Sequence, residues 1–273
     1  MYKVNVKHGN AETKDGVRIA YQISGDGPAL VCCHAMACDN RMYDQHRDVF
    51  SERHTMITFD QRGSGGSDHP LFSEGPDCLY TVETFGEDLK AVLDELGIER
   101  AIILGFSMGV VSALSFSTKY PDRVERLVLV SAMASRLPQK IIDRARLVET
   151  VLDTKGVNAT YDFYYSGTLF EGLLERREFK EQIALARSRA TPHGFKGCFR
   201  VTIDRQSLVN KLNVILCPTL ILVGENDTHY LAESELLERT ISNANRVVMP
   251  GVGHPISAQN PRGFEVEIMS FLS

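Results

Sequence analysis

Residues 102–110 read IILGFSMGV, and this short stretch decides the fold. An apolar run ends at Gly105, Ser107 follows two residues later, and Gly109 follows two residues after that. A strand that turns at once into a helix forces the residue at the corner into strained backbone angles. Glycines on either side remove the side chains that would collide with the neighbouring strand and helix. The stretch therefore predicts a buried strand, a sharp turn that exposes the Ser107 hydroxyl, and a helix.

Short apolar segments that end in glycine or polar turn residues recur along the chain. They predict buried strands of the parallel type at 29–34, 101–106 and 219–224, and looser matches at 54–60, 126–131 and 246–251. Helical patterns fall between them, for example at 81–97, where Thr81 is a candidate N-cap and Gly97 a stop signal. Asn260 and Pro261 mark the start of a last helix. Alternating strands and helices predict an α/β fold with a mostly parallel, doubly wound sheet.

One region interrupts this alternation. From about Ala134 to Val209 no buried strand is evident, and helical patterns surround a group of aromatic residues: Tyr161, Phe163, Tyr164, Tyr165 and Phe170. We therefore expect a core domain at 1–133 and 210–273, with a helical lid inserted at 134–209. The alternative for the aromatic residues is that they pack the core of the lid itself.

Composition and charge restrict the classes of partner. The 273 residues are 43% hydrophobic and carry a net charge of −5, and Lys and Arg form no basic stripe. Nucleic acid and anionic membrane surfaces are therefore poor candidates, and we expect a small-molecule substrate. There is neither an apolar leader at the start nor an apolar run of about 18 residues, which argues against a secretory signal and a membrane span. A homodimer is one alternative for the oligomeric state, which the sequence does not decide.

Six dispersed cysteines without a C-x-x-C motif favour reduced thiols and a cytoplasmic protein. The histidines lack the spacing of metal ligands, so we expect neither a metal nor another cofactor. The glycine-rich RGSGGSD at 62–68 could suggest a phosphate-binding turn. G-x-G-x-x-G and G-K-[ST] motifs are absent, however, so that interpretation is not favoured.

A serine hydroxyl needs a base to remove its proton, and the base needs an orienting partner. His254 lies in a loop between the last predicted strand and the last helix, which suits a base above the sheet edge. Asp227 follows another strand and is the preferred acid. Glu225 lies too close to the end of that strand, and Asp143 lies in a predicted lid helix.

Five motifs in order give the chain a resemblance to the α/β-hydrolase superfamily. They are HAM (34–36), DQRGSGGS (60–67), GFSMG (105–109), GEND (224–227) and PGVGH (250–254). The likeness extends over nearly the whole chain and is strongest to the lidded branch that contains 3-oxoadipate enol-lactone hydrolases and small serine esterases. C–C bond hydrolases and cofactor-free haloperoxidases belong to the same branch.

The resemblance implies a role for each matched residue. Ser107 would be the nucleophile, His254 the general base and Asp227 the residue that orients it. The backbone N–H groups of Met36 and Met108 would form the oxyanion hole. His34 would brace the loop that contains Met36 or would contact the substrate. Three lid aromatics are further candidate substrate contacts: Tyr161, Tyr164 and Phe170.

These features predict a serine hydrolase that cleaves a carboxylic ester or lactone of a small apolar or aromatic molecule. The alternatives are a C–C bond hydrolase, a cofactor-free perhydrolase or haloperoxidase, and a small-molecule receptor with slow or no turnover. Two positions depart from the family pattern, because Ala35 and Val110 replace common glycines. A positive φ at Ala35 would strain the oxyanion loop, and Val110 would change how the helix start packs.

Overall fold

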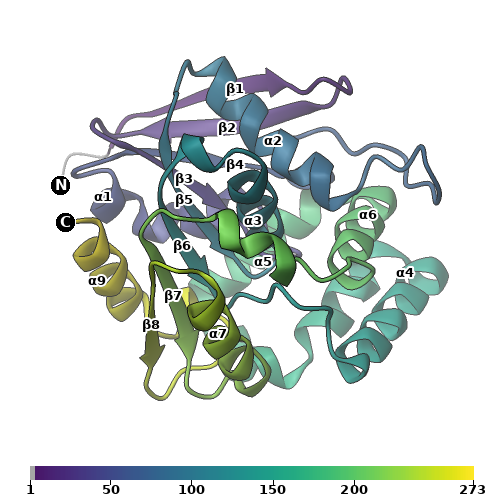
Figure 1. Cartoon of the computed structure of the whole chain (residues 1–273). Helices are drawn as coiled ribbons and strands as arrows, with labels where there is room; N and C mark the ends of the chain where they lie inside the picture. Colours follow the sequence, from purple (N-terminus) through teal and green to yellow (C-terminus); the bar gives the residue numbers. More distant parts are fainter. Residues whose placement is uncertain (1–3) are drawn as a thin grey trace.

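The centre of the structure, a computed structural model that describes residues 4–273, is a twisted sheet of eight strands (Figure 1). The strands are β1 (Val6–Glu12), β2 (Arg18–Ser24), β3 (Ala29–Cys33), β4 (Thr55–Phe59), β5 (Ala101–Phe106), β6 (Val124–Val130), β7 (Thr219–Gly224) and β8 (Ala244–Met249). Their order is β1-β2-β4-β3-β5-β6-β7-β8. β2 runs antiparallel to β1 and β4, and the other neighbours are parallel, so the predicted fold class is confirmed. Residues 1–3 of the predicted core domain lie outside the described residues.

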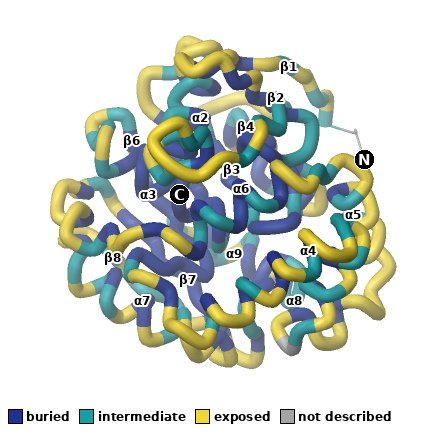
Figure 2. The backbone as a smooth tube through the Cα atoms, turned by 90° about the vertical axis from the view of Figure 1, so that its right-hand side faces the viewer, coloured by how far each residue is buried: buried dark blue, intermediate teal, exposed yellow. Residues whose placement is uncertain are grey.

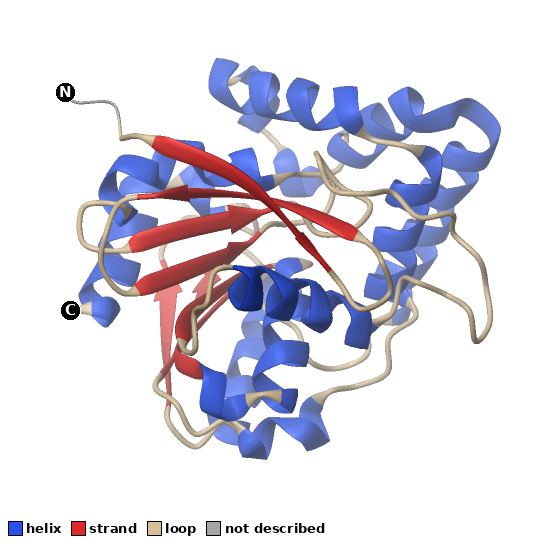
Figure 3. Ribbon diagram, turned by 90° about the horizontal axis from the view of Figure 1, so that it is seen from above, coloured by secondary structure: helices blue, strands red, loops and turns tan. Residues whose placement is uncertain are grey.

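Helices cover both faces of the sheet (Figure 3). The α-helices are α1 (Arg47–Phe50), α2 (Val82–Glu95), α3 (Gly109–Lys119), α4 (Gln139–Tyr165), α5 (Arg177–Arg189), α6 (Pro192–Ile203), α7 (Thr228–Thr240), α8 (Ile256–Gln259) and α9 (Pro261–Leu272). Short 3₁₀ helices are η1 (Asn40–His46), η2 (Pro121–Arg123), η3 (Thr168–Phe170), η4 (Leu173–Glu175) and η5 (Val209–Val214). One apolar core joins the sheet to α2, α3 and α7, and a second joins its other face to α1 and α9.

The two cores explain why β3, β5 and β7 read as unbroken apolar runs. A strand buried on both faces has no solvent side on which polar residues would alternate. Cys32 and Cys33 illustrate this, since they are adjacent in β3 and belong to the two opposite cores. Both side chains are fully buried, and the tube in Figure 2 is accordingly dark blue along the central strands.

The predicted helix starts are confirmed at two positions. Thr81 caps α2, where its hydroxyl accepts a hydrogen bond from the N–H of Thr84. The Thr84 hydroxyl in turn accepts a bond from the N–H of Thr81. Asn260 caps α9 by accepting from the N–H of Gly263, and Pro261 occupies the first turn. Each cap satisfies backbone donors that the first turn of a helix leaves without partners.

In the chain, helices α4, α5 and α6 follow β6 and precede β7, within the predicted insertion (Figure 1). We call residues 134–209 the helical segment. Its longest helix, α4, is interrupted at Gly156, whose φ of 77° lies in the left-handed region. The segment and the loops beside Ser107 share one apolar cluster that includes Met36 and Met108. The helical segment therefore packs directly on the loops at one edge of the sheet.

The glycine-rich turn at 60–68 is a structural element of the core. Arg62 is completely buried and donates hydrogen bonds to the carboxylates of Asp88 and Asp15. Asp60 accepts hydrogen bonds from the backbone N–H groups of Asn40 and Gly66. These bonds hold the turn against the chain that follows β3, beside the edge where Ser107 lies.

Candidate active site

Ser107 occupies the turn between β5 and α3, and its backbone is left-handed with a φ of 53°. A Cβ atom on Gly105 would lie 2.8 Å from the carbonyl oxygen of Gly109. A Cβ atom on Gly109 would collide with the carbonyl oxygen of Cys33 in β3. The prediction that glycines are needed beside a strained corner is therefore confirmed. Strain of this kind costs about 1–3 kcal/mol and persists only where the surrounding structure imposes it.

The structure brings Ser107, Asp227 and His254 together into one chain of hydrogen bonds. The Nδ1 atom of His254 lies 2.7 Å from Oδ2 of Asp227, and Nε2 lies 2.9 Å from Oγ of Ser107. Because a carboxylate can only accept, Nδ1 carries the proton and Nε2 is free to accept from the serine hydroxyl. Asp227 is 4% and His254 11% exposed at the side chain, so water competes little for these bonds.

Close backbone packing brings the acid and histidine loops together. A Cβ atom on Gly224, at the end of β7, would collide with the carbonyl oxygen of Gly253. Asp227 is the N-cap residue of α7 and follows Gly224 by three residues. On the other side, the hydroxyl of Ser131 donates to the carbonyl of His254 at 2.9 Å. The position of the imidazole is thus set by backbone contacts on two sides.

The two alternative acids lie elsewhere. Glu225 is exposed and accepts a hydrogen bond from the N–H of Gly251 at 2.8 Å, so it supports the histidine loop from outside. Asp143 is exposed on α4 and accepts from the side chain of Gln139 at 2.8 Å. Of the three acids that we considered, Asp227 alone contacts His254.

His34 is fully buried and braces the loop that follows β3. The N–H of Gln61 donates to its Nε2 at 3.1 Å, so Nδ1 carries the proton and donates to the carbonyl of Ala35 at 2.8 Å. Both ring nitrogens are therefore occupied. Of the two roles that we considered for His34, this geometry matches the bracing role, and His34 does not line the cavity beside Ser107.

The positive φ in the loop that follows β3 lies two residues after Ala35. Ala35 does not have a positive φ, whereas Ala37 has a φ of 57°. Within residues 4–273, the N–H groups of Met36 and Met108 make no backbone hydrogen bond. Both N–H groups are therefore available to another acceptor. Val110 is buried in the core beneath α3, and its Cα would lie 3.0 Å from a Cβ on Gly105.

Non-glycine residues with positive φ gather around this site. In the described part of the chain they are Ala37, Ser107 and Ser131, with φ values of 57°, 53° and 46°. Ala37 lies next to Met36, and Ser107 forms the turn between β5 and α3, which we call the elbow. The Ser131 hydroxyl donates to the backbone carbonyl of His254. Unfavourable backbone conformations of this type are typical of functional sites.

A small apolar cavity of about 40 Å³ opens beside Ser107 and His254. Tyr164 and Phe170, two of the predicted substrate contacts, line it. Tyr161 instead lines a neighbouring space of about 10 Å³. Tyr165, a member of the aromatic group noted in the sequence, also lines the cavity beside Ser107. Phe179 and Gln182, which the sequence analysis did not name, line it as well. His254 is the one side chain that can carry a positive charge among the described residues that line the cavity.

A larger surface groove of about 460 Å³ adjoins this cavity. Met42, Phe179, Gln182 and Ala258 line both spaces. Phe179 and Gln182 lie three residues apart on α5, and such residues share one face of a helix. This face of α5 therefore separates the small inner cavity from the open groove.

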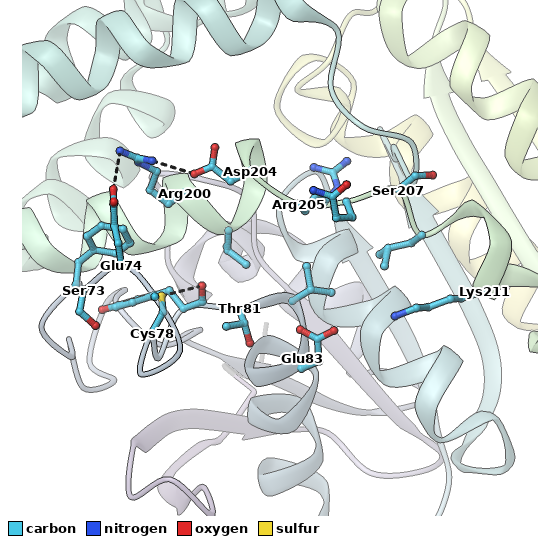
Figure 4. A pocket seen from close by; sticks show the side chains of 17 residues that line it. Ser73, Glu74, Cys78, Thr81, Glu83, Arg200, Asp204, Arg205, Ser207 and Lys211 are labelled. Atoms are coloured by element: carbon cyan, nitrogen blue, oxygen red, sulfur yellow. Dashed lines mark hydrogen bonds and ion pairs between the residues drawn. The ribbon is translucent and has the colours of Figure 1, made fainter.

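A larger hollow lies away from this site. It measures about 550 Å³ and lies between the loop before α2 and the end of α6 (Figure 4). Charges of both signs line it, and Arg200 is paired with Asp204 and Glu74. None of Ser107, Asp227 and His254 lines this hollow. Chemistry rather than volume therefore identifies the candidate site.

Burial determines the state of the other groups beside Ser107. It raises the pKa of the Cys38 thiol to about 12, so this cysteine is neutral and a poor nucleophile. Tyr230 is a residue that the sequence analysis missed, and its ring centroid lies 4.4 Å from that of His254. Its position three residues after Asp227, one turn along a helix, is the signal that could have identified it.

A model of the alpha/beta hydrolase fold family matches residues 28–261, which is most of the chain. The chain belongs to the alpha/beta hydrolase fold family. The predicted resemblance is thereby confirmed, and membership of this family supports a hydrolase with a small-molecule substrate.

Relatives of this alpha/beta hydrolase match it over nearly its full length. A Bacillus subtilis (strain 168) protein provisionally named 2-succinyl-6-hydroxy-2,4-cyclohexadiene-1-carboxylate synthase is 26% identical and aligns over 97% of this chain and 98% of its own. A hydrolase from Pseudomonas aeruginosa PA01 is 28% identical, with a TM-score of 0.86 and coverage of 98% of both chains. The enol-lactonase from Burkholderia xenovorans LB400 is 23% identical, with a TM-score of 0.82 and coverage of 97% and 99%, and this likeness shows the fold alone.

Within residues 4–273, no helix has both the length and the apolar composition that crossing a membrane requires. In the same part of the chain, no group of three or more His, Cys, Asp or Glu side chains is arranged to hold a metal ion.

Gly109→Ala tests the packing of the elbow. The new methyl group would collide with the backbone of β3, and overpacking of this kind costs about 1–3 kcal/mol or more. We expect urea denaturation to show a loss of stability in that range or greater. Gly66→Ala is the matched control, since its Cβ would lie 3.5 Å from the nearest atom and Gly66 has no positive φ. Equal stability of the two variants would contradict this account of the elbow.

Proposed function

We propose that the protein hydrolyses a carboxylic ester or lactone of a small apolar or aromatic molecule through an acyl-enzyme on Ser107. One observation carries the proposal, namely the chain of hydrogen bonds from Asp227 through His254 to Ser107. This arrangement allows an imidazole to take the serine proton while a carboxylate stabilises the imidazolium that forms. The reaction class of its relatives gives further support, because they include a 3-oxoadipate enol-lactonase of Acinetobacter baylyi.

The proposed mechanism has two halves. In the first, the Ser107 oxygen attacks the carbonyl carbon and its proton passes to Nε2 of His254. The bond to the leaving oxygen then breaks, and this oxygen receives the proton. In the second, His254 removes a proton from water and the hydroxide attacks the acyl carbon. The bond from that carbon to the Ser107 oxygen then breaks, Ser107 receives the proton, and the carboxylic acid leaves. The N–H groups of Met36 and Met108 would stabilise the negative oxygen in each half, and one such donor contributes about 3–4 kcal/mol.

The walls of the cavity support a neutral, small acyl group. A space of about 40 Å³ holds little more than the chain of a short acyl group, and aromatic and aliphatic side chains dominate its lining. An isolated carboxylate in such surroundings would lose its hydration without gaining a cationic partner other than His254. We therefore assign short, uncharged acyl groups to this cavity. The leaving alcohol would extend past Phe179 and Gln182 into the outer groove.

The roles of the larger parts of the molecule belong to the same proposal. We assign the core function to 1–133 and 210–273, and the function of a lid to the helical segment at 134–209. Apolar side chains of the segment line the cavity, which supports this division. We also place the protein in the cytoplasm, where its six free cysteines would remain reduced.

Ser107→Ala tests the nucleophile. We expect kcat for 4-nitrophenyl acetate to fall at least about 10⁴-fold, because alanine lacks the oxygen that attacks the carbonyl carbon. Asp227→Asn should reduce kcat to a similar extent by favouring the wrong tautomer of His254. Release of nitrophenolate by the purified variants is the measurement, with unchanged melting temperatures as the control for folding. Full activity of Ser107→Ala would exclude this mechanism.

Phe179→Ala tests the wall between the cavity and the groove. Removal of the ring should join the two spaces, so that longer acyl chains fit. We expect the ratio of kcat/KM for the hexanoyl ester to that for the acetyl ester to rise about tenfold. This corresponds to burial of one to two additional methylene groups. Leu147→Ala is the control, since Leu147 is exposed on α4 and lines neither space. An unchanged ratio in Phe179→Ala would show that Phe179 does not limit the acyl site.

A further inference from the structure

Two aromatic rings lie close to the imidazole of His254, and both belong to residues near its hydrogen-bond partners in the chain. Phe106 precedes Ser107 and approaches with its edge, at 6.3 Å between centroids and 88° between planes. Tyr230 follows Asp227 by one helical turn and lies closer, at 4.4 Å and 51°. The closest aromatic contact of the proposed base is therefore a residue of the acid's own helix.

The first turn of α7 places Asp227 and Tyr230 on one face. Asp227 is the N-cap residue, and residues three apart lie above one another on a helix. The next turn adds Glu233, which accepts hydrogen bonds from the N–H groups of Ala134 and Ser135 at 2.9 and 2.7 Å. These bonds tie α7 to the chain that follows β6. Helix α7 is consequently a fixed support for the Tyr230 ring.

The contacts of His254 change during the proposed reaction, on which this inference rests. In the free protein, the imidazole is held by Asp227, by Ser107 and by the Tyr230 ring. Once the Ser107 oxygen is bound to the acyl carbon, it has no proton to donate to Nε2. The imidazole then keeps the Asp227 bond and the aromatic contact. Its orientation therefore depends on Tyr230 more than it does in the free protein, at the stage when the imidazole has to accept a proton from water.

We propose that Tyr230 is a positioning residue whose ring holds His254 in the orientation that deacylation requires. The step that depends on it balances as follows. Water loses a proton to Nε2, its oxygen forms a bond to the acyl carbon, and the bond from that carbon to the Ser107 oxygen breaks. The proton then passes from Nε2 to Ser107, and the carboxylic acid leaves.

The Tyr230 hydroxyl is compatible with this role. Burial and the charge of Asp227 raise the pKa of Tyr230 to about 12, while Arg205 and the Ser107 hydroxyl act in the opposite direction. The phenol therefore remains neutral at ordinary pH. A neutral ring beside Asp227 adds no second negative charge next to the imidazolium.

Tyr230→Leu tests the proposal on 4-nitrophenyl acetate, whose leaving group makes acylation fast. We expect kcat to fall about tenfold and KM to fall with it, so that kcat/KM changes less than about threefold. Intact-protein mass spectrometry after an acid quench should show more acylated chain than in the wild type. Tyr230→Phe restores the ring and should recover most of the lost kcat. His229→Leu, at the exposed neighbouring position on α7, should match the wild type.

Tyr230→Met, whose unbranched and flexible side chain adapts more easily to the space left by the ring, replaces Tyr230→Leu if the latter does not fold. Its kcat should fall in the same way. An unchanged kcat in a folded variant without the ring would overturn the proposal. A loss in kcat/KM as large as that in kcat would overturn it too, because acylation would then depend equally on Tyr230. Absence of acylation in the wild type would instead contradict the proposed function itself.

Discussion

The left-handed turn at Ser107 is the constraint on which the rest of the site depends. It exists because the backbone of α3 approaches the backbone of β3 so closely that only glycine fits at position 109. A second close approach, between Gly224 and Gly253, brings the acid loop against the histidine loop. Backbone contacts of this kind leave little freedom. They hold the oxygen of Ser107 within 2.9 Å of His254 without relying on flexible side chains.

Strain is concentrated where this precision is needed. Among the described non-glycine residues, positive φ occurs at Ala37, Ser107 and Ser131, in three loops that meet at the same edge of the sheet. The buried cores on both faces of the sheet supply the stability that offsets this cost. The helical segment contributes in a different way, since its side chains close a small apolar cavity over the serine. In the proposed function, the core performs the chemistry and the segment selects the acyl group.

Most strands and the three residues of the hydrogen-bond chain could be predicted, because the patterns that determine them are local in the sequence. The strand predicted at 101–106 coincides with β5. Those at 54–60 and 246–251 differ from β4 and β8 by one and by two residues, respectively, at each end. Ser107, Asp227 and His254 follow strands whose carboxyl ends meet at one edge, so their meeting could be inferred from order alone. The antiparallel hairpin of β1 and β2 was not predicted, although Ile19, Tyr21 and Ile23 alternate with polar or small residues in β2.

The features of the site that the sequence did not predict depend on packing between elements that are distant in the chain. The wall formed by Phe179 and Gln182 depends on how α5 is oriented over the core, and no local pattern encodes that orientation. The bonds of His34 fix the start of its loop, and the positive φ of this loop lies at Ala37 rather than at Ala35. Tyr230 contacts His254 across two separate loops. The aromatic residues of the helical segment were recognised as a group in the sequence. Which of them line the cavity depends on how the helices of the segment pack on the core.

Covalent labelling tests the central claim most directly. The claim is that a backbone-imposed geometry makes Ser107 a nucleophile with His254 as its base. The purified protein would be treated with a fluorophosphonate, digested and analysed by mass spectrometry. The account predicts one phosphonylated residue, Ser107, with labelling at least about a hundredfold slower in His254→Ala. Labelling at another residue, or labelling of Ser107 at an unchanged rate without the imidazole, would contradict it.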